Sequence, residues 1–193
     1  VGASVVNALS EYLKVEVIRS GFLYRQEFSR GLPTTGLLKV EPTKKSNGTL
    51  ISFKPDNTIF VDNCTFSPEK IFKILEYKAY LVAGVQINWK CHSSLIVENS
   101  NLPISKKLCF LNGLSEYINS KTSNTQMFTA SSFEDNVKIE QESVEWAVRW
   151  FTHDEDNFVD TFCNTVPTPL GGTHEIGFRQ AFTKGIRNFA DIK

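Results

Sequence analysis

The sequence predicts a protein of the α+β class, an α/β sandwich in which helices pack against sheets. Three observations predict it. Residues 14–31 alternate between apolar and polar side chains around a Ser20-Gly21 turn, which is typical of a β-hairpin. Residues 67–84 carry apolar side chains at helical spacing between a serine and a glycine. Residues 137–151 alternate again and are followed by a helical pattern from residue 173.

The composition is that of a globular protein without strong charge. The chain has 193 residues, of which 41% are apolar, enough for one large or two small domains. Its 21 basic and 21 acidic residues cancel, so net charge does not attract it to nucleic acid or anionic lipid. Neither an apolar run of about 18 residues nor a signal-like leader occurs, so we expect a soluble, cytoplasmic protein.

The four cysteines do not indicate a metal site. Cys64, Cys91, Cys109 and Cys163 are far apart and form no CxxC pair, which argues against zinc and against a thioredoxin-like dithiol. We expect them to be reduced and partly buried.

The first element is expected to be a helix that begins at Ser4 as its N-cap. One face of this helix would carry Val5, Val6, Leu9, Tyr12 and Leu13. The hairpin follows, and on its first strand Val15, Val17 and Arg19 share a face. Because a guanidinium follows two apolar side chains, this face should leave the core at a cavity mouth or at solvent.

Further strands and one strong helix complete the first domain. Residues 37–41 and 49–56 are predicted strands, and the second of them carries Thr49, Ile51 and Phe53 on one face. The helix over residues 67–84 has Ser67 as N-cap and Gly84 just past its end. Residues 85–90 are expected to be a strand. Residues 91–107 are polar and irregular, so we place the domain boundary there, giving domains 1–107 and 108–193.

The second domain is expected to contain a short helix over residues 113–120, a long strand over 137–151, a turn over 153–157, a strand over 158–164 and a final helix. Alternation in the long strand predicts a buried face of Val144, Trp146, Val148 and Trp150. The final helix should begin at Thr173 and bury Phe178, Phe182, Ile186 and Phe189.

Three features exceed a plain α/β interpretation, and each has a simpler alternative. The "VGAS" start of the first helix suits an anion, because free N–H groups and small residues face it, but small residues before a capped helix more often form just a tight turn. Thr49 is either a site hydroxyl or a β-favouring residue. Gly171-Gly172 could admit a ligand or another backbone, or be ordinary loop residues, and His174 beside them is more simply structural.

Convincing catalytic groups are not evident from the residues. Glu140, Glu142 and Glu145 are split between two faces by strand alternation, and no nucleophile with a base is spaced for catalysis.

Longer stretches resemble a known family. The segments "VGASVVNALSEYLKVEVIRSGFLYRQEFSRGLP", "NGTLISFKPD" and "NTVPTPLGGTHEIGFRQAFTKGIR" resemble, in order and at matching separations, the ATPase subunit of bacterial type IIA topoisomerases. The stretches "INWKCHSSL", "SVEWAVRWF" and "CNTVPTPLGGTHE" look more like its topoisomerase IV branch than its gyrase branch. The resemblance implies the C-terminal part of a GHKL-type ATP-binding domain, followed by the start of a ribosomal-protein-type transducer domain.

The resemblance also assigns site residues. Val1, Gly2 and Ala3 match the end of the family's phosphate-binding lid, and Ser4 begins the helix that the phosphates cap. Further ATP contacts implied by the family are Thr49, whose hydroxyl would join a water-bridged network to adenine, and Ile51 on the same face. Arg19 and Gly48 would lie at the pocket edge, where inhibitors of the family bind.

Catalysis itself is expected to need residues outside this chain. In the family the general-base glutamate, the Mg²⁺-binding asparagine and the adenine-binding aspartate precede the position of Val1, and a γ-phosphate-sensing lysine follows that of Lys193. The parent is therefore expected to be an ATP-hydrolysing, Mg²⁺-dependent DNA topoisomerase, and this fragment to be inactive, without catalytic or metal residues. Two departures from the family are Asn112 in a usual glycine pair and Leu170 at an often acidic position.

The family implies partners as well: the A subunit of topoisomerase IV in a heterotetramer, DNA through other domains, and a second copy through the ATP-bound N-gate, with no membrane. It implies a bacterial cytoplasmic, nucleoid-associated location. Three alternatives stay open: the same region of gyrase B, a non-catalytic α/β interaction module in which "VGAS" is a mere turn, and another GHKL protein.

Overall fold

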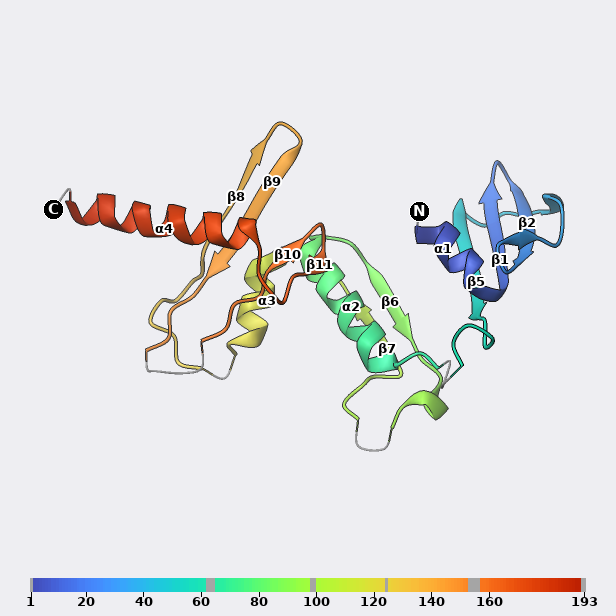
Figure 1. Cartoon of the computed structure of the whole chain (residues 1–193), viewed down its shortest axis with the longest axis horizontal. Coiled ribbons are helices and arrows are strands. Elements are labelled where there is room, and N and C mark those ends of the chain that lie inside the picture. Colours follow the sequence, from blue (N-terminus) through green and yellow to red (C-terminus); the bar gives the residue numbers. More distant parts are fainter. Residues whose placement is uncertain (1, 62–64, 98–99, 124, 153–156, 192–193) are drawn as a thin grey trace. The chain divides into compact units, whose positions relative to one another are not determined.

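The structure is a computed structural model that describes residues 2–61, 65–97, 100–123, 125–152 and 157–191. The chain divides into two compact units, Val1–Phe66 and Ser67–Lys193 (Figure 1). Helices and strands are mixed in both units, which confirms the α+β class. The domain boundary expected after residue 107 stays a prediction, because these units are defined by packing alone.

The first unit is a small antiparallel sheet with one short helix. Its strands lie in the order β3-β2-β1-β5, and β4 pairs with β2. The elements are α1 (Gly2–Ala8), β1 (Ser10–Arg19), β2 (Phe22–Ser29), β3 (Leu32–Pro33), β4 (Leu38–Pro42) and β5 (Gly48–Pro55).

The predicted hairpin is confirmed. β1 and β2 pair from Leu13 opposite Phe28 to Arg19 opposite Phe22. Ser20 and Gly21 both have positive φ, 51° and 75°, which matches the right-handed twist of the flanking strands. The Thr43 amide then donates to the Gly21 carbonyl at 2.8 Å, which attaches the end of β4 to the turn.

The helix predicted from Ser4 to Leu13 is wrong at both ends. α1 begins at Gly2, so Ser4 is inside the helix and not its N-cap, and β1 begins at Ser10. Leu13 is only 5% exposed because it pairs with β2 and β5 at once. A short helix has little stability of its own, so the pairing of β1, which from Leu13 to Ile18 occurs on both sides, outweighs an extension of the helix.

A buried carboxylate fastens one end of this sheet. Asp56, which is 1% exposed, forms an ion pair with Arg30 and accepts hydrogen bonds from the Thr58 amide at 2.9 Å and its hydroxyl at 2.8 Å. The Asp56 amide donates to the Leu9 carbonyl at 3.0 Å. Hydrogen bonds from Arg30 and then Thr58 hold the Asp56 pKa well below its usual range. The end of β5 is thus tied to the junction of α1 and β1.

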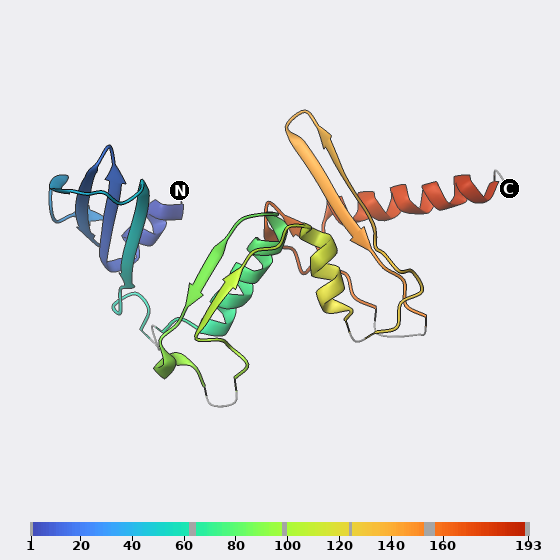
Figure 2. The same cartoon turned by 180° about the vertical axis from the view of Figure 1, so that it is seen from behind.

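The described residues of the second unit form three helices and three two-stranded hairpins, with one 3-10 turn. Figures 1 and 2 show α2 alongside the β6–β7 hairpin from both sides. The elements are α2 (Pro68–Leu81), β6 (Ile87–Lys90), η1 (Ser93–Leu95), β7 (Ser105–Leu108), α3 (Gly113–Lys121), β8 (Phe133–Ile139), β9 (Glu142–Val148), β10 (Phe162–Cys163), β11 (Val166–Pro167) and α4 (Thr173–Asp191).

The helix predictions for this unit are confirmed. The Ser67 side chain accepts from the Lys70 amide, Pro68 occupies the first turn, and Gly84 follows the end of α2 with a φ of 81°. α3 and α4 begin where the sequence predicts, and α4 starts at Thr173.

Three strand predictions are wrong. The long strand over 137–151 is the end of β8, a turn and β9, because Glu140 takes a φ of 53° and reverses the chain. In the segment 158–164 only Phe162–Cys163 forms a strand. β7 lies in the stretch expected to be irregular. Its adjacent lysines do not show the apolar and polar alternation typical of a strand, yet it pairs with β6. The turn predicted over 153–157 falls almost wholly outside the described residues.

Aromatic side chains form the core of the second unit. Tyr117 contacts Tyr77, Tyr80 and Phe162 at centroid distances of 5.3 to 6.1 Å, while Phe110 stacks on Tyr80 at 3.6 Å. A second cluster joins the β8–β9 hairpin to α4; its members are Phe133, Trp146, Trp150, Phe178 and Phe182.

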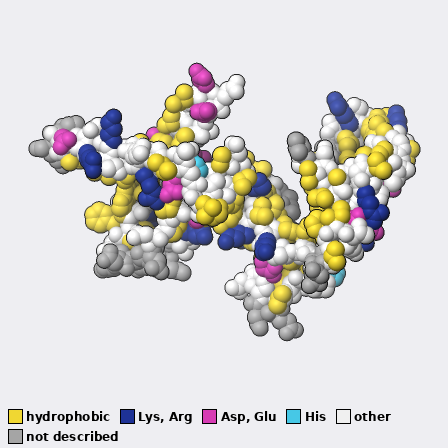
Figure 3. All heavy atoms as spheres, viewed as in Figure 1, with side chains coloured by type: hydrophobic (Ala, Val, Ile, Leu, Met, Phe, Trp, Pro, Cys, Tyr) yellow, Lys and Arg dark blue, Asp and Glu magenta, His cyan; other side chains and the backbone are white. Residues whose placement is uncertain are grey.

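The predicted burial on β9 and α4 is only partly right. Trp146, Val148, Phe178 and Phe182 are half-buried. Val144 and Trp150 are exposed, and so are Ile186 and Phe189 at 55% and 63%. Figure 3 shows apolar side chains at the surface along the β8–β9 hairpin. In the described part of the chain, no helix is long and apolar enough to cross a membrane.

Candidate functional site

One face of the first unit's sheet gathers several predicted site residues. Val17 lies opposite Tyr24 on β2 and opposite Thr49 on β5. Val15 in the same way lies opposite Gln26 and Ile51. Directly opposed residues project from the same side of a sheet, so these side chains form one continuous face.

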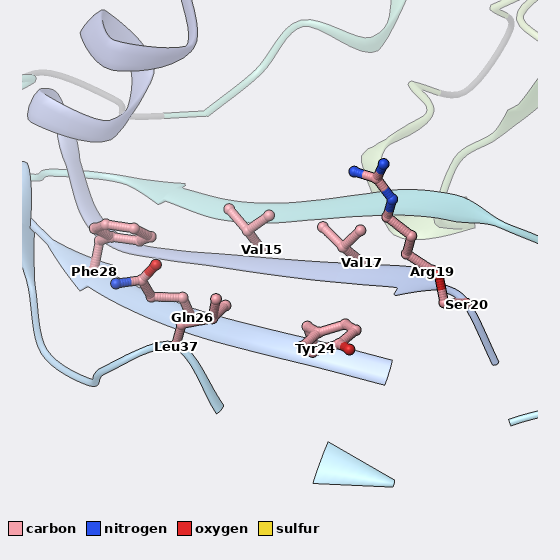
Figure 4. Close-up of a pocket in the computed structure, with 8 residues that line it drawn as sticks. All are labelled: Val15, Val17, Arg19, Ser20, Tyr24, Gln26, Phe28 and Leu37. Carbon is pink, nitrogen blue, oxygen red and sulfur yellow. The ribbon is translucent and has the colours of Figure 1, made fainter. Parts of the chain in front are cut away.

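A pocket of about 590 Å³ lies over this face. Figure 4 shows Val15 and Val17 projecting from β1 to the same side, with the Arg19 guanidinium at the strand's end. The expected passage from an apolar face to a cavity is therefore confirmed for these three residues. The full lining is Val15, Val17, Arg19, Ser20, Tyr24, Gln26, Phe28 and Leu37.

The residues expected on β5 lie beside this pocket and not in its lining. Thr49 and Ile51 share the pocket's face of the sheet across β1, and Ile51 is 50% exposed. Gly48 pairs with Ile18 at the strand end that carries Arg19. Arg19, Gly48, Thr49 and Ile51 are thus brought to one part of the sheet.

The residues expected to contact phosphates lie on α1, which joins the opposite end of β1. Gly2, Ala3 and Ser4 are exposed in its first turn. Figure 4 shows α1 on the side of the sheet toward which Val15 and Val17 project. Ser10 and Arg19, at the two ends of β1, are about 30 Å apart at the usual rise per residue, so α1 and Arg19 delimit a long surface. Val1 lies outside the described residues.

Several pocket residues were missed in the sequence. Tyr24, Gln26 and Phe28 alternate on β2, and the two-residue turn fixes which β1 residue each one opposes, so the pattern could have shown them. Leu37 could not be found in this way. Its loop is held by Thr35, whose hydroxyl accepts from the Glu27 amide at 3.0 Å.

The two faces of this sheet differ sharply in charge. On the face away from the pocket, Glu16 bonds Arg25 at 2.7 Å and Lys14 at 3.1 Å. The hydrogen bonds from Arg25 and then Lys14 lower the Glu16 pKa. Among the described residues that line the pocket, Arg19 alone is charged. An apolar floor with one guanidinium at its end suits a flat ring bearing an anionic or carbonyl group.

Other candidate groups have structural partners. His174 contacts the Thr168 hydroxyl, with no acidic partner of a catalytic triad among its described hydrogen bonds. Within the described residues, no cluster of three His, Cys, Asp or Glu side chains could hold a metal ion. Cys91, Cys109 and Cys163 are free thiols, as expected. Cys91 is half-buried, but Cys109 and Cys163 are exposed, so the prediction of partial burial is wrong for these two. Cys64 lies outside the described residues.

Known proteins are similar to this chain in fold and in sequence. The fold superimposes on the 43K ATPase domain of Thermus thermophilus gyrase B, solved with an aminocoumarin, with a TM-score of 0.81 and 30% identity. That match covers 98% of this chain and 50% of the other. The B subunit of DNA topoisomerase 4 from Rickettsia bellii is 41% identical over 100% of this chain. The chain is therefore similar in sequence and fold to B subunits of type IIA topoisomerases.

Two further matches agree with this similarity. The DNA gyrase B family model matches residues 113–193 of the chain. The topoisomerase IV ATP-binding domain of Francisella tularensis, in complex with a small-molecule inhibitor, superimposes with a TM-score of 0.77 at 26% identity, over 98% of this chain and 49% of that one. This chain spans 29% of the Rickettsia protein and about half of the solved domains.

Proposed function

We propose that this chain forms part of the ATPase subunit of a topoisomerase IV, contributing the end of its ATP-binding domain and the start of its transducer domain. The parent would use ATP binding and hydrolysis to drive DNA duplex passage, decatenation and relaxation. The observation that carries the proposal is the 41% identity, over the whole chain, to the B subunit of a topoisomerase 4.

The residues of the sheet face fit a nucleotide base. Val17 and Ile51 offer apolar contact to a flat ring, and the hydroxyl of Thr49, which lies opposite Val17, offers a hydrogen bond toward adenine. Arg19 and Gly48 would line the mouth of the site. ATP, when bound, supplies the free energy of phosphoanhydride hydrolysis, while these side chains bind and orient it.

The start of α1 is proposed to contact the phosphates. Gly2, Ala3 and Ser4 are small and exposed, so a phosphate could approach their backbone, and the family resemblance extends this role to Val1. Mg²⁺ is proposed to accompany ATP. Its ligand is expected outside this chain, and we derive no catalytic step through it.

The partners of the parent are part of the same proposal. They are the A subunit of topoisomerase IV, DNA bound through other domains, and a second copy that dimerises at the N-gate when ATP is bound. The proposed location is the bacterial cytoplasm, in association with the nucleoid.

A chimera tests this function. The chain would replace the matching 194-residue segment of the Rickettsia bellii protein, which aligns with all of it. We expect the purified chimera, with its cognate A subunit, to hydrolyse ATP and to decatenate linked DNA circles. A folded chimera without ATPase activity would refute the proposal and favour a non-catalytic interaction module.

Variants of the chimera test the site. Thr49→Val removes a hydroxyl on the nucleotide face and should raise the KM for ATP by roughly tenfold, the effect of one lost hydrogen bond. Ser52→Ala is the matched control, because Ser52 pairs with Lys14 and belongs to the opposite face of β5. Arg19→Ala should weaken binding of an aminocoumarin with a smaller effect on ATP. Equal effects of Thr49→Val and Ser52→Ala would remove Thr49 from the site.

Gyrase B is the second candidate. The family model over residues 113–193 is described as DNA gyrase B, and a gyrase B domain superimposes over nearly the whole chain. Pairing the chimera with the A subunit of each enzyme separates the two. Supercoiling with a gyrase A subunit, combined with failure to decatenate with a topoisomerase IV A subunit, would favour gyrase.

A further inference from the structure

Side chains of the same segment fill the space beside Gly171 and Gly172. A Cβ atom at Gly171, where φ is 73°, would lie 2.5 Å from Glu175 Oε2. A Cβ atom at Gly172 would lie 2.7 Å from the ring of His174. The two glycines therefore make room for His174 and Glu175, and neither a ligand nor another backbone needs to be invoked.

A chain of hydroxyl groups leads from this point into the β10–β11 hairpin. His174 Nε2 lies 3.3 Å from Thr168 Oγ1. Thr168 Oγ1 lies 2.6 Å from Thr161 Oγ1, and the Thr161 hydroxyl also lies 2.9 Å from the Thr168 carbonyl oxygen. Three polar contacts thus connect the first turn of α4 with the segment that enters β10.

Counting protons fixes the direction of these contacts. The Thr168 carbonyl can only accept, so the Thr161 hydroxyl must donate to it. The Thr168 hydroxyl must then donate to Thr161 Oγ1, because Thr161 has no second proton. The remaining contact can form only if His174 carries a proton on Nε2 and donates it to Thr168 Oγ1.

The hairpin that receives this contact is itself anchored. Lys78 Nζ on α2 donates to Thr165 Oγ1 at 3.0 Å, in a turn where Asn164 and Thr165 both have positive φ. Phe162 packs at 5.5 Å from Tyr77 and at 6.1 Å from Tyr117. The hairpin is therefore fixed to α2 and α3 on one side and to the start of α4 on the other.

We propose that Thr161, Thr168 and His174 form a latch that holds the first turn of α4 on the β10–β11 hairpin, with His174 as hydrogen-bond donor. His174 is a positioning residue in this device. The latch makes the placement of α4 depend on the β10–β11 hairpin, which Lys78 of α2 anchors.

Amide hydrogen exchange on the full chain tests the latch. The Ile176 amide donates to the Gly172 carbonyl at 3.1 Å and reports the first turn of α4. Thr168→Val keeps the shape and removes the hydroxyl, so exchange at Ile176 should become roughly tenfold faster. Thr168→Ser should restore the slow rate. Thr183→Val is the matched control, because its hydroxyl bonds the Arg179 carbonyl farther along the same helix.

The proton position gives a second test that needs no variant. Nitrogen-15 NMR of the neutral His174 ring should show the proton on Nε2. A proton on Nδ1 would overturn the latch, and so would an unchanged Ile176 rate in Thr168→Val or a fast rate in Thr168→Ser. None of these results depends on ATP, so failure of the latch leaves the proposed function untouched.

Discussion

Asp56 illustrates what a single buried side chain does in this protein. Its carboxylate joins Arg30, which follows β2, to the turn at Thr58, while its backbone holds Leu9. Three segments far apart in sequence therefore meet at one charge. Removing one partner of a buried ion pair is more damaging than replacing both, since the other partner is left uncompensated.

The ion pair predicts acid sensitivity. The Asp56 pKa is lowered by folding, so its stabilising effect is present above the unfolded value of 3.8 and is lost as pH falls below it. Urea midpoints measured from pH 7 down to pH 2 should fall steeply at the acid end. Asp56→Asn should lower the midpoint at pH 7 and flatten this acid decline.

Asp135→Asn is the control for this experiment, because Asp135 is exposed and, among the described residues, accepts a hydrogen bond from its neighbour's amide alone. An acid decline that is equally steep in wild type and Asp56→Asn would show that other groups cause it.

The glycines of α4 and its preceding loop give a second prediction at this scale. Gly172→Ala forces a methyl group against the His174 ring and should destabilise the chain by about 1–3 kcal/mol. Gly185 lies in α4 with open space around it, so Gly185→Ala should stabilise by about 0.5–1 kcal/mol. Chemical denaturation of both variants measures the two changes. Similar effects of the same sign would contradict this account.

At the scale of elements, α3 is held by its tyrosine. The Tyr117 hydroxyl donates to Asp160 Oδ2 at 2.5 Å, which connects α3 to the segment before β10. Burial, followed by the hydrogen bond to Asp160, raises the Tyr117 pKa above its ordinary value. Its ring packs at the same time against α2 and β10. The polar and apolar parts of one side chain thus orient three elements.

Tyr117→Phe separates these two contributions. The ring packing is kept and the hydrogen bond is lost, so the free energy of unfolding should fall by about 1 kcal/mol, the Asp160 side chain being exposed and free to bind water. Thermal or urea unfolding measures it. Tyr80→Phe, in the same aromatic cluster, should cost less, because no hydrogen bond of its hydroxyl occurs among the described residues. A larger loss in Tyr80→Phe would be inconsistent with this assignment.

The elements also show how far sequence patterns reach. α2 was predictable because Ser67, Pro68 and Gly84 mark its ends chemically. The β8–β9 turn was not, because Glu140 and Gln141 lack the glycine or asparagine that favours positive φ. Leu9 and Leu13 have a spacing that fits a helix, yet tertiary pairing places Leu13 in β1.

The candidate site was predictable to a similar degree. Alternation alone placed Val15, Val17 and Arg19 on one face, because strand geometry dictates it. The strand pattern left Thr49 open as a site hydroxyl on the same face as Ile51, and the family resemblance assigned both to the site. Their proximity to Val17 and Val15 depends on the β1–β5 pairing across some thirty residues, about which a local pattern carries no information. Leu37 depends on a loop held by one threonine and could not be foreseen.

At the scale of the whole molecule, the described residues give the proposed nucleotide site one sheet face and few side walls. Ile51 and Phe53 remain 50% and 43% exposed, and the described pocket residues come from β1, β2, the turn between them and the loop that carries Leu37. Binding sites for drug-sized ligands usually bury 70–90% of the ligand, which calls for walls on several sides.

We therefore expect the 193-residue chain by itself to bind ATP weakly or not at all. Isothermal titration calorimetry with ATP and Mg²⁺ measures this, and the chimera described above serves as the positive control. Micromolar affinity of the isolated chain, lost in Thr49→Val, would mean that the sheet face and α1 suffice for binding.

The contrast between the two faces of the first sheet also bears on how the strands find each other. Side chains alternate with a period of two, so sliding β1 by one residue against β2 would exchange its faces. Glu16 would then lose Arg25 and turn toward the apolar side, where Tyr24 and Phe28 offer it no countercharge. The ion pairs of Lys14, Glu16 and Arg25 thus disfavour hairpins paired in the wrong register while the chain folds. This effect on strand register is separate from their modest contribution to the stability of the folded state.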